Sequence, residues 1–229
     1  MNPSFATQVT ALVRKDLRRE LRSGETLVTT TSFSLLLMLI FTFAFYQRDE
    51  TVALVFPGIL WVAIIFSGML AIGRTFAQEQ ESGCLRALAL IPGTQTSLYT
   101  AKLLVNLIFM GVFELALVPM LALAFSVNIF EHFGWFVVIL GAGTLGFAIL
   151  GTLISAMLVH NSLKDVLLPL VLFPLVVPLL IGGVKATGLL MPGVDPTGLQ
   201  TWAVVMLMID VAFLLGAFFM FRWVLSAIE

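Results

Sequence analysis

Six apolar stretches, each about 20 residues long or longer, follow one another along the chain. They cover residues 27–46, 52–73, 103–125, 135–159, 166–184 and 202–224. A helix of about 20 apolar residues crosses the hydrocarbon core of a bilayer, and the alternating ten-residue pattern of a membrane β-barrel is absent. The pattern predicts an all-α integral membrane protein, built as a bundle of six transmembrane helices.

The segment before the first apolar stretch is predicted to be an amphipathic helix over residues 4–22. Its apolar residues recur mostly at spacings of three and four and form one stripe, namely Phe5, Val9, Leu12, Val13, Leu17 and Leu21. The remaining surface carries most of its cations, Arg14, Lys15, Arg18, Arg19 and Arg22. We expect residues 1–26 to lie in the cytoplasmic interface, with the apolar face in the acyl boundary and the cations at anionic headgroups. Two roles stay open: anchoring alone, or also presenting a surface to a cytoplasmic partner.

The positive charges predict the orientation of the bundle. The termini and loops on the side of the first segment hold ten Lys and Arg residues, whereas the opposite side holds only Arg48 and Lys185. Because cytoplasmic loops carry the excess of these residues, both termini are expected in the cytoplasm. The first apolar run is too long for the core of a signal peptide and lacks an A-x-A cleavage site, so no cleaved signal is expected.

The amino-acid composition excludes several classes of protein and of functional site. Apolar residues make up 60% of the 229-residue chain and charged residues 11%, against about 25% charged in soluble domains. The net charge of −1 and the clustering of cations at one end argue against nucleic acid as a partner. The single cysteine, Cys84, excludes an internal disulfide framework and any CxxC metal site. No GxxxxGK[ST], HExxH or GxSxG motif occurs, so no catalytic residue, metal site or P-loop is predicted in this chain.

Two further motifs have a structural interpretation. Gly141, Gly143 and Gly146 spell the GxGxxG of dinucleotide sites, but inside an apolar run, where small residues let membrane helices pack closely. His132 and His160 fall on opposite sides of the membrane and cannot share a metal. Both are interpreted as solvated loop residues, with His132 as an axial haem ligand kept as the alternative.

Polar residues and prolines inside the spans are a second set of candidate functional residues. Glu114 and Asp210 lie within the third and sixth spans, where carboxylates usually mark a pathway, a polar contact or a relay. Either a hydrogen bond between helices or a part in conformational coupling accounts for them. The fifth span contains Pro169, Pro174 and Pro178, which predict a bent helix that acts as a hinge or is merely tolerated by packing.

The longest non-apolar segment, residues 74–102, carries the motifs that identify a family. It contains Glu79-x-Glu81-x-Gly83-x-Leu85-x-x-Leu88, followed by Pro92 and Lys102. Together with the basic N-terminal helix and the six spans, these residues resemble a type-2 ABC-transporter permease. Pro57-Gly58-Ile59-Leu60-Trp61 and Arg74-x-Phe76-x-x-Glu79 add a resemblance to the CcmB family, the haem exporter permeases of cytochrome c-type biogenesis, over essentially the whole chain.

The resemblance implies a membrane subunit that hydrolyses no ATP itself. In that family the ATPase is a separate polypeptide, CcmA; CcmC and CcmD complete the assembly, and the haem chaperone CcmE is released from it at the expense of ATP. Haem and ATP would be handled by the complex in the bacterial inner membrane, with no cofactor bound by this chain. Segment 74–102 would be the cytoplasmic coupling loop of the transmembrane domain 27–229. The implied ATPase contacts are Glu79, Glu81, Gly83, Arg86, Lys164 and Asp165.

Alternatives to this interpretation remain. Two ATPase subunits need two docking surfaces, so the chain is expected to pair with a second copy of itself or with another membrane subunit. A related permease that exports a lipid or another hydrophobic solute shares all of these sequence features. An intramembrane enzyme using Glu79, Glu81 and His160 is disfavoured, because side chains two residues apart on a helix point in different directions.

Overall fold

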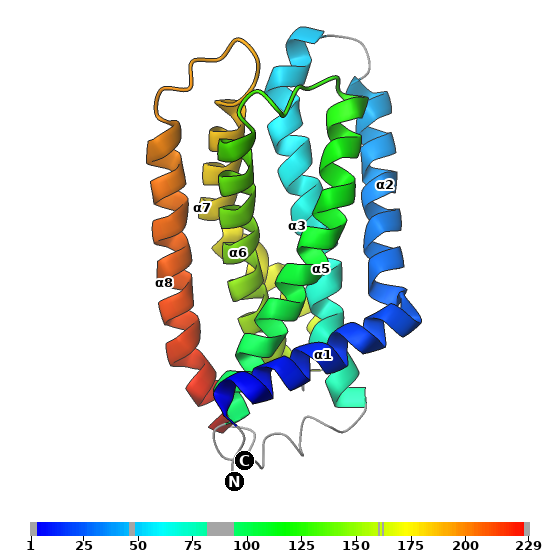
Figure 1. Cartoon of the computed structure of the whole chain (residues 1–229), viewed down its shortest axis with the longest axis vertical. Coiled ribbons are helices and arrows are strands. Elements are labelled where there is room, and N and C mark those ends of the chain that lie inside the picture. Colours follow the sequence, from blue (N-terminus) through cyan, green and yellow to red (C-terminus); the bar gives the residue numbers. More distant parts are fainter. Residues whose placement is uncertain (1–3, 46–48, 82–93, 160, 162, 227–229) are drawn as a thin grey trace.

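A computed structural model of the chain describes residues 4–45, 49–81, 94–159, 161 and 163–226. These residues form seven helices and no strand, and six of the helices are long and apolar enough to cross a membrane. Figure 1 shows the six running side by side, with the remaining helix lying across one end of the bundle. The prediction of an all-α, multi-pass membrane protein is therefore confirmed. The end of the bundle that carries this crossing helix is called the α1 end below.

The helices follow the apolar stretches but extend beyond several of them. In chain order they are α1 (Phe5–Ser23), α2 (Glu25–Phe45), α3 (Asp49–Glu81), α5 (Thr94–Ala124), α6 (Phe133–Leu158), α7 (Lys164–Gly188) and α8 (Leu199–Ser226). The 33 residues of α3 make a helix of about 50 Å at 1.5 Å per residue, which exceeds the roughly 30 Å of hydrocarbon. Residues 74–81 and 94–102 of the expected loop are therefore helical continuations of α3 and α5.

Helix α1 is capped at both ends by its own sequence. The Ser4 side chain accepts a hydrogen bond from the backbone N–H of Thr7 at 3.4 Å, which satisfies one of the free donors at the helix start. At the other end Gly24 has a φ of 62° and donates its N–H to the carbonyl of Glu20. This left-handed conformation is easy for glycine only, and it turns the chain directly into α2.

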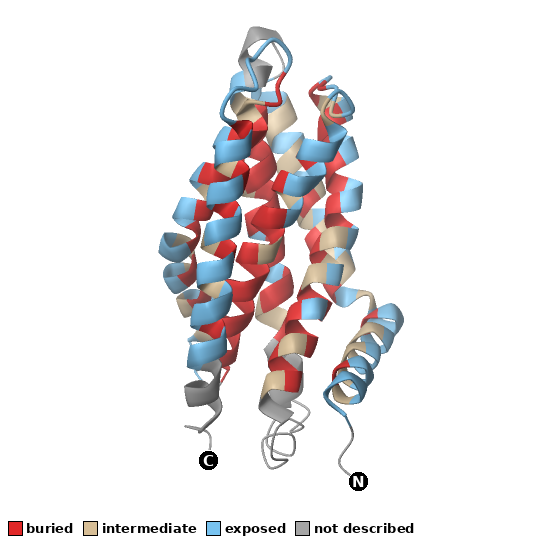
Figure 2. Ribbon diagram, turned by 60° about the vertical axis from the view of Figure 1, so that its left-hand side comes forward, coloured by how far each residue is buried: buried red, intermediate tan, exposed pale blue. Residues whose placement is uncertain are grey.

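Helix α6 forms the centre of the bundle. Within the apolar windows of the six helices, 72% of the α6 residues are buried, against 11% in α2 and 22% in α8. Figure 2 shows buried residues lining the inner faces of the helices and exposed ones covering the outside. Large apolar side chains such as Leu115, Leu123 and Phe219 are exposed on this outside, as expected where lipid replaces water as the solvent.

Small residues of α6 and α7 accommodate the largest side chain in the core. Trp61 of α3 is 1% exposed and lies against Gly143 and Gly183, where an added Cβ would collide with its ring. Its indole N–H donates to Thr187 Oγ1 of α7 at 3.0 Å. The predicted role of the GxGxxG segment in helix packing is confirmed for Gly143 and for Gly146, which lies against Leu179 and Asp210.

The three prolines of α7 lie inside one uninterrupted helix. Pro169, Pro174 and Pro178 all fall between Lys164 and Gly188. Pro174 and Pro178 are exposed on the outer side of the bundle, where the rings project away from the neighbouring helices. The hinge role of these residues stays a prediction.

Candidate functional site

The α1 end gathers most of the polar residues that the sequence associates with coupling. Glu79 and Glu81 belong to the last turn of α3, but their side chains lie outside the described part of the structure. Gly83 and Arg86 fall among residues 82–93, outside the described residues. The proposed contacts of these four residues with an ATPase stay predictions.

The second predicted contact lies beside Gly73 of α3, about two turns before the end of that helix. Lys164 is partly exposed and Asp165 exposed at the start of α7, where a carboxylate is stabilised by the positive end of the helix dipole. They line a small cavity with Gly73, Ser155, Leu158, Val159 and Leu168. Ser155 Oγ donates to the carbonyl of Ile72 at 3.2 Å and joins α6 to α3 there. The fold thus brings α7, α6 and α3 together at the α1 end.

A buried ion pair fixes α1 onto the bundle. Lys102 of α5 is 2% exposed, and its ammonium group lies 2.7 Å from Asp16 Oδ2 of α1. The same ammonium donates to the carbonyl of Thr75 in α3 at 3.4 Å, and Ser97 Oγ of α5 donates to Gln8 Oε1 of α1 at 2.8 Å. Charge-assisted contacts of this kind are among the stronger hydrogen bonds in proteins, so α1 is held by the protein itself.

Two more acidic residues stabilise the corner between α1 and α2. Glu20 is 4% exposed, and its Oε1 accepts the backbone N–H of Leu27 at 2.9 Å, a donor that the first turn of α2 cannot satisfy internally. Glu25, in the first turn of α2, pairs with Arg74 of α3. The acids of this corner are therefore used to connect α1, α2 and α3.

A chain of hydrogen bonds leads from the ion pair into the bundle. Thr75 Oγ1 donates to Asn106 Oδ1 of α5 at 2.6 Å, and Asn106 Nδ2 donates to Thr152 Oγ1 of α6 at 2.9 Å. Asn106 and Thr152 are fully buried. Interhelical hydrogen bonds in membranes contribute about 0.6 kcal/mol each on average. We call Asp16, Lys102, Thr75, Asn106 and Thr152 the polar chain; it joins α1, α5, α3 and α6.

The polar chain was not predicted from the sequence, where Lys102 counted as a loop cation and as one residue of the family resemblance. One signal for it exists. Asp16 and Glu20 follow Val9 at spacings of seven and eleven and so lie on the apolar stripe of α1, which indicates acids that face a protein partner. Val9 is 7% exposed and α1 packs mainly on α5. This part of the stripe therefore contacts α5, and the location of residues 1–26 in the membrane interface stays a prediction.

The two intramembrane carboxyl groups lie on either side of α6. Glu114 of α5 is 5% exposed and accepts a hydrogen bond from Thr144 Oγ1 at 2.7 Å, which is the interhelical bond that one interpretation expected. Asp210 of α8 is 3% exposed and lies against Gly146. Neither of its oxygens has a hydrogen-bond partner among the described residues. A part in conformational coupling stays a prediction for both.

The opposite end of the bundle carries His132 and the turn that precedes α8. His132 precedes the first turn of α6 and makes no capping bond, and Phe130 stacks on Phe133 beside it with ring centroids 6.0 Å apart. In the turn before α8, the Thr197 hydroxyl donates to Asp195, and this bond, with the Thr197 backbone N–H, lowers the pKa of that carboxyl. Among the described residues no group of three or more His, Cys, Asp or Glu side chains is arranged to hold a metal ion.

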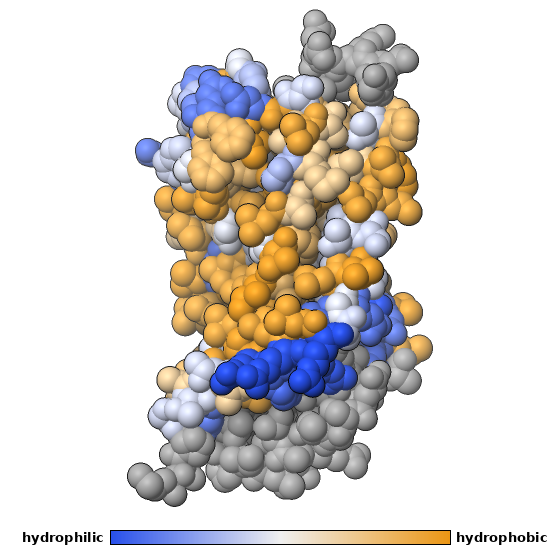
Figure 3. Space-filling model, turned by 45° about the vertical axis from the view of Figure 1, so that its right-hand side comes forward, coloured by the Kyte–Doolittle hydropathy of each residue, from blue (hydrophilic) through white to orange (hydrophobic). Residues whose placement is uncertain are grey.

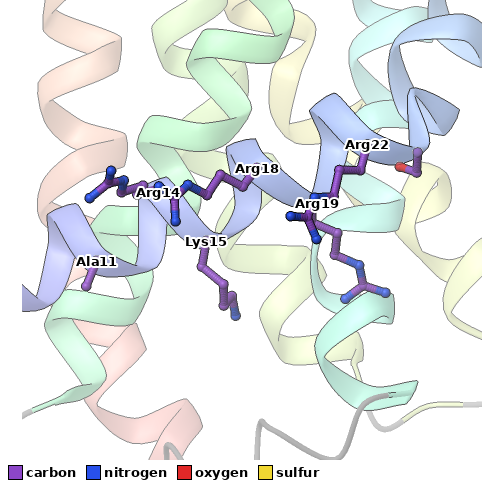
Figure 4. Close-up of a pocket in the computed structure, with 7 residues that line it drawn as sticks. Ala11, Arg14, Lys15, Arg18, Arg19 and Arg22 are labelled. Atoms are coloured by element: carbon purple, nitrogen blue, oxygen red, sulfur yellow. The ribbon is translucent and has the colours of Figure 1, made fainter.

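The outward face of α1 is strongly cationic. Arg14, Lys15, Arg18, Arg19 and Arg22 are all exposed and, with Ala11 and Ser23, border an open hollow (Figure 4). Figure 3 shows α1 as a hydrophilic band directly below the apolar belt of the transmembrane helices. Taken together, the α1 end combines an exposed charged face with buried polar links to four other helices, an arrangement able to bind a charged partner and to transmit its displacement.

Comparison with known proteins gives consistent matches along most of the chain. The family model described as CcmB protein matches residues 7–226. Heme exporter protein B of Rhodobacter capsulatus is 31% identical over 175 residues, which cover 76% of this chain and 80% of that protein. Heme exporter protein B of Paracoccus denitrificans is 30% identical over 194 residues, covering 81% and 85%. The Escherichia coli K12 protein of the same name is 30% identical over 100 residues, covering 44% and 46%.

Proposed function

The chain belongs to the CcmB protein family, and from that premise we propose that it is the membrane subunit of an ABC transporter for haem export and cytochrome c maturation. The match over residues 7–226 is the observation that carries the proposal. The name of the relatives, heme exporter protein B, supports haem as the cargo of the complex. The sequence contains no P-loop, which agrees with ATP hydrolysis on a separate subunit, CcmA.

In this proposal, energy enters the bundle at the α1 end, which faces the cytoplasm. ATP-driven closure of two CcmA subunits displaces the end of α3 and the start of α7, through Glu79, Glu81, Gly83, Arg86, Lys164 and Asp165. Rigid helices transmit such a displacement because their buried faces interlock. The polar chain would pass the movement from α3 to α5 and α6, and its output is the delivery of haem and the release of haem-loaded CcmE.

The orientation and the remaining partners follow from the same proposal. The excess of Lys and Arg at the α1 end favours a cytoplasmic location for this end and for both termini, in the bacterial inner membrane. Two CcmA subunits require a second membrane surface, which we assign to another copy of this chain or to CcmC, with CcmD completing the complex.

The coupling contact is tested by reversing the charge of its acidic residues. Glu79→Lys/Glu81→Lys should insert normally but lose most of the CcmA that co-purifies with the wild-type chain. Glu131→Lys, at the exposed opposite end, serves as the matched control and should retain CcmA. Undiminished CcmA in the double variant would remove these residues from the coupling surface.

The cargo is tested separately by deleting the gene in its native host. Loss of covalently attached haem in c-type cytochromes, restored by the wild-type gene, would support haem delivery. Normal cytochrome maturation after deletion would contradict it and favour a permease for a lipid or another hydrophobic solute.

A further inference from the structure

The charges of α1 are separated between its two faces. The helix has two acids, Asp16 and Glu20, and both turn towards the bundle, where Lys102 and the backbone N–H of Leu27 engage them. The face that remains carries five cations and no acid. One of the five, Lys15, lies 3.4 Å from Asp16 Oδ1.

Three arginines of this face form a regular row. Arg14, Arg18 and Arg22 are four residues apart and so occupy one edge of the helix, all exposed. Like charges at this spacing repel one another and destabilise a helix in water. The row becomes favourable where an anionic surface lies alongside it, and guanidinium groups match phosphate oxygens through paired N–H donors.

The position of the row selects a membrane surface over an acidic protein. Figure 3 shows the hydrophilic band of α1 directly against the lower edge of the apolar belt, the level of lipid headgroups. Leu21, beside Arg22, is 80% exposed, and Phe5 is 51% exposed on the same helix. Figure 4 shows Lys15 and Arg19 pointing away from the transmembrane helices, whereas Arg14 and Arg18 extend along α1. Cations next to exposed apolar side chains at this level suit phospholipids, whose phosphate groups would meet the cations and whose acyl chains would meet the apolar side chains.

We propose that the arginine row of Arg14, Arg18 and Arg22 binds the phosphate groups of anionic phospholipids in the leaflet at the α1 end. The ion pair between Lys102 and Asp16 docks α1 on the bundle without lipid, so the lipids bind to a helix that is already in place. The proposal concerns this chain alone and does not depend on its cargo or its ATPase.

The test measures lipid binding to the purified full chain. Native mass spectrometry after delipidation in detergent compares phosphatidylglycerol with phosphatidylcholine of identical acyl chains. The wild-type chain should prefer phosphatidylglycerol. This preference should fall about fivefold for each arginine removed, so that R14Q/R18Q/R22Q loses about 100-fold in total. The charge-retaining R14K/R18K/R22K variant is the matched control and should keep most of the preference.

Two results of this comparison would overturn the proposal. The first is an unchanged preference for phosphatidylglycerol in the glutamine variant. The second is no preference in the wild-type chain together with loss of a co-purifying ATPase from the glutamine variant, because the row would then be a protein-docking surface. If the glutamine variant does not fold, the wild-type chain is measured at rising ionic strength. Its preference must then decline as salt screens exposed charges, and a salt-independent preference would contradict the proposal.

Discussion

Replacing Asp16 by leucine removes the carboxylate that neutralises a buried ammonium group. In the Asp16→Leu variant, Lys102 would lose the carboxylate that lies 2.7 Å from its ammonium group, while its side chain stays 3% exposed. Breaking a buried ion pair by removing one of its two charges typically costs about 3–5 kcal/mol, because the remaining charge loses its counter-ion in a site with little water. Asp16 itself is 12% exposed, so some water reaches the site, and we expect the lower end, about 3 kcal/mol.

Removing the lysine as well should restore most of the lost stability. In Asp16→Leu/Lys102→Met both charges disappear and apolar side chains of similar size fill their places. Substitutions of whole buried ion pairs by apolar residues are often neutral or stabilising. The double variant should therefore lie within about 1 kcal/mol of the wild type, even though it carries one substitution more than the unstable single variant.

The free energy of unfolding is measured in mixed micelles by titration with a denaturing detergent, followed by tryptophan fluorescence. Glu131→Gln removes a charge at an exposed position of the opposite end and should change the free energy by less than about 0.5 kcal/mol. A single variant as stable as the wild type, or a double variant as unstable as the single one, would refute the assignment of the ion pair as the anchor of α1.

Three further outcomes are expected. Gly143→Ala places a methyl group against the indole ring of Trp61 and should lower the free energy of unfolding by about 1–3 kcal/mol. The matched variant Gly141→Ala meets no atom within 4 Å and should be neutral or stabilising. Equal stability of the two variants would contradict this packing. Asp210→Asn keeps the shape of a side chain whose oxygens lack hydrogen-bond partners among the described residues. The free energy of unfolding of this variant should therefore not fall. A loss above about 1 kcal/mol would indicate a hydrogen-bonded carboxylate. In spheroplasts an impermeant maleimide should leave the native Cys84 unmodified and modify the Thr197→Cys variant; the reverse result would invert the topology.

The sequence predicted the spans because bilayer thickness dictates their length. Runs of about 20 apolar residues are hard to place anywhere but in the membrane, and all six were found as helices. The ends were less predictable. The apolar run of the second span ends at residue 73, whereas α3 continues to Glu81, because good helix formers such as glutamate and glutamine can extend a helix beyond the membrane.

Contacts between residues far apart in the sequence could not be predicted from the hydrophobic pattern. Asp16 and Lys102 are separated by 86 positions, and Trp61 and Thr187 by 126. Periodicity defines which face of a helix is buried but not which helix covers it. For the same reason, the sequence predicted a polar partner for Glu114 but not which residue it is. The structure shows that the partner is Thr144. The residues placed at the ATPase contact came from a family resemblance, and their role stays a prediction.

The most direct test of the account is affinity purification of this chain from its native membrane under gentle extraction, with identification and quantification of what accompanies it. We expect a P-loop ATPase in two copies together with haem-handling membrane partners, and the measured ratio will show whether the second membrane surface is another copy of this chain. Recovery of the chain without any ATPase would contradict its assignment as the membrane subunit of an ABC transporter.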